Sequence, residues 1–129
     1  MIRLIVNGQI ANDAATLPFS NALLRGDGLF ETLLAIDQKI IAWQKHYERL
    51  ASGATALEIS IPAKIDFEIS INKLISDLNG KSRIRITVLS DGNWVVSAQS
   101  EPEDNLPVSL IKISEPVISN GILTGIKSI

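Results

Sequence analysis

The chain has 129 residues, which is the length of one domain, and 46% of them are hydrophobic, enough to bury a core. Its 14 acidic and 12 basic residues give a net charge of -2 with no lysine- or arginine-rich block, so nucleic acid is not an expected partner. The sequence contains no cysteine, which excludes disulfides and thiolate metal sites, and no apolar run of membrane-spanning length, so we expect a cytoplasmic protein.

The first third of the chain alternates apolar and polar residues, which predicts β-strands. Asn7-Gly8 suits a tight turn because both residues tolerate positive φ, so residues 2–6 and 9–11 are expected to pair as a hairpin. A buried strand is predicted over residues 29–36, and residues 39–42 are expected to return beside it.

Two helices are predicted next, because the apolar spacing changes from two residues to three or four. The apolar face of the first, over 43–57, consists of Trp43, Tyr47, Leu50, Ala54 and Leu57. Pro62 separates it from a second helix over 67–79, for which Asp66 is the expected N-cap and Asn79-Gly80 the expected end.

Strands are predicted again beyond Gly80. Residues 83–89 and 94–99 alternate in polarity around an Asp91-Gly92 turn, and further short strands are expected over 108–113 and 116–118. Strands, then two helices, then strands joined by hairpin turns predict an α+β fold. In this fold an antiparallel sheet has two main helices packed on one face.

Three short segments carry the functional prediction. They are Gly26-Asp27-Gly28-Leu29-Phe30-Glu31-Thr32, then His46-Tyr47-Glu48-Arg49-Leu50, and finally Gly125-Ile126-Lys127-Ser128-Ile129. Taken singly, each has an ordinary structural explanation: a turn, a solvated helix arginine and a surface lysine. Together they resemble the class IV aminotransferases, a family of pyridoxal-phosphate enzymes. It includes branched-chain and D-amino-acid aminotransferases and aminodeoxychorismate lyase.

The resemblance implies a cofactor, pyridoxal 5'-phosphate, and two residues that bind it. Lys127 would be the catalytic lysine, which holds the cofactor through its amine and then moves a proton at the substrate Cα. Arg49 would hold the cofactor phosphate, a role that suits a planar guanidinium whose charge is permanent. His46 receives no catalytic role.

Substrate contacts are implied for three further residues. Phe30 would form a wall of the substrate pocket, although its structural explanation is simply a core residue. Arg85 would help to receive acidic substrates, or else it is an exposed strand arginine. Arg25 replaces a residue that is commonly aromatic in the family and, if it faces the pocket, would favour a substrate with a carboxylate.

The resemblance covers the chain only as the N-terminal part of a family member. We expect an N-terminal domain over 1–118, an interdomain segment over 119–129 that carries Lys127, and a second domain that this chain lacks. The chain alone is therefore expected to show little transaminase activity and to lack cofactor if binding needs the second domain. A homodimer is expected, without nucleic acid or membrane.

The leading functional hypothesis is amino-group transfer between an amino acid and a 2-oxo acid. One alternative is the lyase branch of the same family, which converts aminodeoxychorismate to 4-aminobenzoate and pyruvate. A second alternative is a non-catalytic α+β domain that binds no cofactor.

Overall fold

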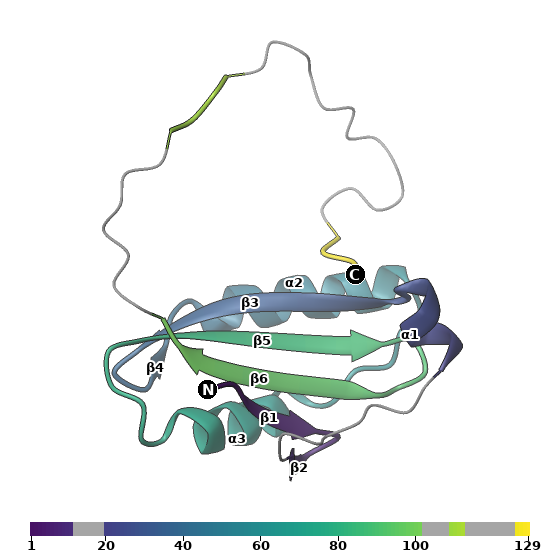
Figure 1. Cartoon of the computed structure of the whole chain (residues 1–129). Coiled ribbons are helices and arrows are strands. Elements are labelled where there is room, and N and C mark those ends of the chain that lie inside the picture. Colours follow the sequence, from purple (N-terminus) through teal and green to yellow (C-terminus); the bar gives the residue numbers. More distant parts are fainter. Residues whose placement is uncertain (12–19, 102–108, 113–125) are drawn as a thin grey trace.

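A computed structural model describes residues 1–11, 20–101, 109–112 and 126–129 of the chain. Its elements are β1 (Arg3–Val6), β2 (Gln9–Ala11), α1 (Asn21–Arg25), β3 (Gly28–Ile36), β4 (Lys39–Ile40), α2 (Trp43–Ala56), α3 (Lys64–Ile75), β5 (Lys81–Leu89) and β6 (Trp94–Ser100). The strands form one antiparallel sheet in the order β2-β1-β6-β5-β3-β4. Figure 1 shows α2 and α3 on the same face of this sheet, so the predicted α+β fold is confirmed.

The predicted hairpin turns are present, and their backbone angles explain the residues found there. Asn7 and Gly8 connect β1 to β2 with φ of 48° and 82°, and Asp37 and Gln38 connect β3 to β4 with φ of 45° and 67°. Two consecutive positive φ angles define the turn whose twist matches that of paired strands. The Asp37 carboxylate also accepts a hydrogen bond from the Gly80 amide at 2.8 Å, which ties this turn to the start of β5.

The core lies between the sheet and the two long helices. Alternation along the paired strands β3 and β5 sends one set of side chains, including Leu33 and Ile86, into this layer. The apolar faces of the two helices pack against these side chains, and they bury Leu50 of α2 and Phe67 and Ile71 of α3. The apolar face predicted for the first helix is confirmed, since each of its residues belongs to the core or packs against it.

The second helix departs from its predicted bounds. It spans Lys64–Ile75 rather than 67–79, its N-cap is Ala63, and Asp66 lies inside its first turn without a capping hydrogen bond. The earlier start follows from Pro62, which cannot sit within a helix and leaves the residues just after it free to begin one. Asp66 still favours this end of the helix, because a negative charge in the first turn complements the helix dipole.

Two further differences concern segments outside the sheet. Helix α1 was not predicted; Ser20 caps it by accepting a hydrogen bond from the Leu23 amide, and Gly26 ends it at a φ of 64°. Gly26 therefore terminates a helix, and the strand begins only at Gly28.

The prediction of a strand over 108–113 is wrong for residues 109–112. Leu110 and Ile111 are exposed there and are unpaired within the described part of the chain, and residues 116–118 lie outside that part. Among the described residues, no helix has the length and apolar character needed to cross a membrane.

Candidate active site

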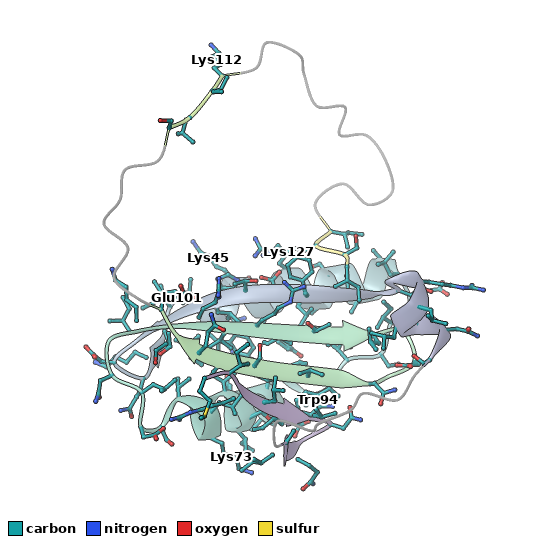
Figure 2. The ribbon with its side chains drawn as sticks, viewed as in Figure 1. Lys45, Lys73, Trp94, Glu101, Lys112 and Lys127 are labelled. Carbon is teal, nitrogen blue, oxygen red and sulfur yellow. The ribbon has the colours of Figure 1, made fainter. Side chains whose placement is uncertain are left out.

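Lys127 lies on a short segment that returns from the far end of the sequence to the edge of β3. The Phe30 amide donates a hydrogen bond to the Lys127 carbonyl at 2.9 Å, and the Ile129 amide donates one to the Gly28 carbonyl at 3.1 Å. Leu29 and Ser128 thereby form an antiparallel bridge. Figure 2 shows Lys127 on this segment beside β3, so the lysine is anchored by backbone pairing rather than frayed.

Gly53 leaves room for the segment of residues 126–129 to pack against α2. A Cβ on Gly53, in the middle of α2, would lie 3.2 Å from Leu29 and 3.4 Å from the Ile126 side chain. A glycine in a helix interior costs roughly 1 kcal/mol relative to alanine. Here it lets α2 approach the residues on either side of the bridge. The position of Lys127 thus depends on the close packing of α2, β3 and residues 126–129.

Glu31 is the buried charged group of the site. Its side chain projects from β3 into the layer between sheet and helices and is 1% exposed. Arg49 of α2 donates to it twice, from Nε to Oε1 at 2.6 Å and from Nη2 to Oε2 at 2.5 Å, and His46 Nδ1 lies 2.7 Å from Oε2. His46 and Arg49 are three residues apart on α2, so both reach the same carboxylate.

The electrostatics around Glu31 favour its charged form. Burial by itself raises the pKa of Glu31, but the hydrogen bonds from Arg49 and His46 and the positive charges of Arg49 and Lys127 lower it below its ordinary value. The site therefore combines one buried carboxylate with an arginine, a histidine and a lysine.

Phe30 lies on the other face of the sheet, next to two cations. The Lys127 Nζ atom is 4.8 Å from the centre of the Phe30 ring, and Arg85 Cζ of the neighbouring strand β5 is 3.9 Å from it. Both distances are within the range of cation–π attraction. Arg85 also lines a cavity of about 330 Å³ on this open sheet face. The other lining residues are Ile2, Thr32, Arg83, Ser97 and Gln99.

A comparison with known protein families identifies the family of this chain. The class IV amino-transferase family matches residues 28–127, which is most of the chain. The chain belongs to this family. Members of the family are enzymes that depend on pyridoxal phosphate.

Three relatives are distant in sequence, and each of them is longer than this chain. A protein of Methanocaldococcus jannaschii named "Putative branched-chain-amino-acid aminotransferase" is 35% identical over 63 residues, which cover 47% of this chain and 22% of that protein. A hypothetical aminotransferase from Mycobacterium tuberculosis in its PLP-bound form aligns with a TM-score of 0.67 and 21% identity, over 80% of this chain and 41% of that one. For a "putative branched-chain amino acid aminotransferase" from Thermotoga maritima the TM-score is 0.71 and the identity 20%, over 83% and 39%. The structural matches thus show the fold, and the chain spans less than half of either structure.

The fold brings together four of the five residues that the family resemblance selected. Arg49 bonds Glu31 on the helix side of β3, and on the other face Phe30 lies within 4.8 Å of Lys127 Nζ and 3.9 Å of Arg85 Cζ. Arg25 does not join them: it is exposed in the last turn of α1, and no hydrogen bond or ion pair links it to the others within the described residues.

Glu31 and His46 were not predicted as site residues, although the sequence contains a signal for Glu31. Period-two alternation assigns Glu31 to the same strand face as Leu29 and Leu33, and that face is buried. A carboxylate at a core position requires cationic or hydrogen-bonding partners. His46 and Arg49, at helical spacing just beyond the next hairpin, could supply them.

We expect Glu31 to make the protein sensitive to acid. A carboxylate whose pKa is lowered in the folded state contributes stability above its unfolded pKa, near 4.5, and this stability is lost as the pH falls through the folded pKa. Urea unfolding followed by tryptophan fluorescence between pH 7 and pH 3 measures this loss. The wild type should lose more stability below pH ~4.5 than Glu31→Gln, whose side chain does not titrate. Parallel curves for the two proteins would contradict the assignment.

Proposed function

We propose that this chain provides the lysine and the phosphate anchor for pyridoxal-phosphate-dependent amino-group transfer between an amino acid and a 2-oxo acid. The observation that carries the proposal is the pairing of the Lys127 segment with β3, the strand that also carries Glu31 and its partner Arg49. Family membership supports the same assignment. A family lyase that releases pyruvate is the alternative reaction.

The side chains present fit the chemical groups of pyridoxal phosphate. Arg49 is 48% exposed, and its Nε and Nη2 donors face Glu31 and His46, so Nη1 can donate a hydrogen bond to a phosphate oxygen. Lys127 supplies the primary amine that the cofactor aldehyde requires, and it lies over the Phe30 ring, where it would move a proton at the Cα of a substrate bound there. When bound, the cofactor supplies an electron-accepting ring that makes loss of this proton possible.

We further propose that the substrate lies along Phe30. Since Lys127 Nζ and Arg85 Cζ both contact its ring, at 4.8 and 3.9 Å, they can be no farther apart than the sum of these distances. A substrate whose Cα lies at Lys127 could therefore place a distal carboxylate at Arg85, where the guanidinium offers paired donors. Arg25 is retained as a weaker candidate for a substrate contact. The domain division at residue 118, the homodimer and the cytoplasmic location stay predictions.

The test of the proposed function is the selective attachment of pyridoxal phosphate to Lys127. The chain is incubated with the cofactor and reduced with borohydride, and the modified peptides are mapped by mass spectrometry. We expect modification at Lys127 and much less at Lys45, an exposed lysine of α2 that serves as the internal control. Lys127→Ala should abolish the selective modification, whereas Lys45→Ala should leave it unchanged. Equal modification of both lysines in the wild type would refute the proposed function.

A further inference from the structure

We propose that Glu31 is a positioning residue, which orients the Arg49 guanidinium so that one defined edge of it meets the phosphate of the cofactor. The inference rests on the proposed function and adds to it a residue that touches neither cofactor nor substrate. It starts from a buried carboxylate that the chemistry of amino transfer does not itself use.

The two hydrogen bonds from Arg49 determine which edge remains available. Nε and Nη2 form one side of the guanidinium, and both donate to Glu31, at 2.6 and 2.5 Å. The end formed by Nη1 and the second hydrogen of Nη2 points away from this carboxylate, because the guanidinium is planar. Nη2 also lies 3.3 Å from His46 Nδ1, whereas Nη1 makes no hydrogen bond among the described residues. Nη1 is therefore the donor that is left for a phosphate oxygen.

Glu31 can fix the orientation of Arg49 because the position of Glu31 is itself fixed by the sheet. It is buried in β3, which pairs with β5 on one side and with residues 127–129 at its start on the other. His46 contacts the same carboxylate at 2.7 Å. Arg49, in contrast, has a long side chain that is half exposed, so without this partner it would sample many rotamers. Fixing such a side chain in advance removes part of the entropic cost of ligand binding.

A positioning role and a simple charge effect predict opposite results when Glu31 is neutralised. As a charge alone, the carboxylate repels a phosphate bound nearby, so its neutralisation would strengthen the preference for a phosphorylated ligand. As a positioning group, it pre-orients Arg49, so its neutralisation would weaken that preference. Aspartate separates the two further, because it keeps the charge but is one methylene too short to make both hydrogen bonds.

The first experiment compares the affinities of the chain for pyridoxamine 5'-phosphate and pyridoxamine by calorimetry. These probes differ only in the phosphate and carry no aldehyde, so the ratio of their affinities reports on the phosphate site alone. Both Glu31→Gln and Glu31→Asp should lower this ratio by about three- to tenfold, and Arg49→Lys should lower it as well. The matched control is Asp77→Asn. Asp77 also accepts hydrogen bonds from two donors of one arginine, Arg3, but this pair is exposed. The substitution should leave the affinity ratio unchanged.

The second experiment needs no cofactor and applies even if a variant binds neither probe. The Arg49 Nε–H group, followed by ¹H–¹⁵N NMR, should exchange slowly with water in the wild type and rapidly in Glu31→Gln and Glu31→Asp. Rapid exchange in the wild type, or an unchanged or increased affinity ratio in both Glu31 variants, would overturn the positioning role. A wild type with slow Nε–H exchange but no preference for the phosphorylated probe would instead refute the phosphate site, and with it the proposed function.

Discussion

Gly28→Ala is expected to lower the free energy of unfolding by roughly 3 kcal/mol, because the new methyl group has no space in which to lie. Its Cβ would be 2.3 Å from the Val88 carbonyl oxygen and 3.1 Å from the Leu89 Cα, both backbone atoms of the neighbouring strand β5. It would also be 3.0 Å from the Ile129 side chain. Relief of the two backbone contacts therefore requires β3 to move away from β5, and the Ile129 side chain must shift as well.

Urea unfolding monitored by tryptophan fluorescence measures the effect of Gly28→Ala on stability. Gly80→Ala is the matched control: its Cβ would meet nothing within 4 Å, but its φ of 71° is unfavourable for alanine and costs roughly 1–2 kcal/mol. Gly28→Ala should therefore be the more destabilising of the two. In native-state hydrogen exchange, it should also lose protection at the Phe30 amide, which donates to Lys127. Equal stability losses at the two glycines would show that the crowding at Gly28 is relieved by other means.

Phe67→Ala is expected to cost roughly 3–5 kcal/mol of stability, the largest effect of a single side chain on the core. Phe67 is fully buried in α3 and meets Trp94 of β6 edge to face, with ring centres 5.3 Å apart and planes at 81°. Its loss leaves a cavity and removes an aromatic contact between helix and sheet. We therefore expect a weaker native state and a changed environment for Trp94.

The same urea titration tests the core prediction, with tryptophan emission as its second readout. Ile69→Ala is the control, because Ile69 lies in the same helix but is 47% exposed, and its loss should cost less than about 1 kcal/mol. Phe67→Ala should also shift the emission of the folded state. A cost for Phe67→Ala similar to that for Ile69→Ala would mean that the core closes around the missing ring.

Local physics explains which parts of the fold could be predicted from sequence. The hairpin at Asn7-Gly8 and the apolar face of α2 depend on residues close together in the chain, so turn preference and spacing sufficed. Helix α1 is too short, at five residues, to show a period and is marked only by Ser20 and Gly26. The pairing of Ser128 with Leu29 joins residues far apart in sequence, and no local pattern encodes such a contact.

The candidate site divides in the same way. Family resemblance selected Lys127 and Arg49 but not Glu31. The contact between Glu31 and Arg49 depends on the packing of α2 against β3, which the sequence does not encode locally. Taken singly, Arg49 was explained as a solvated helix arginine, and its half-exposed position gave no sign of a buried partner. Arg25 illustrates the reverse case, since its nearness in sequence to Phe30 did not bring it into contact with the site.

The bridge between Leu29 and Ser128 also has a consequence for the order of folding. Contacts between residues so distant in the chain carry a large loop-closure entropy and tend to form after local hairpins and helices. We therefore expect the sheet and helices to assemble first and the lysine segment to dock last, onto an edge already built. A ligand that binds only the docked segment would stabilise this final step selectively, so the cofactor would act on folding as well as on chemistry.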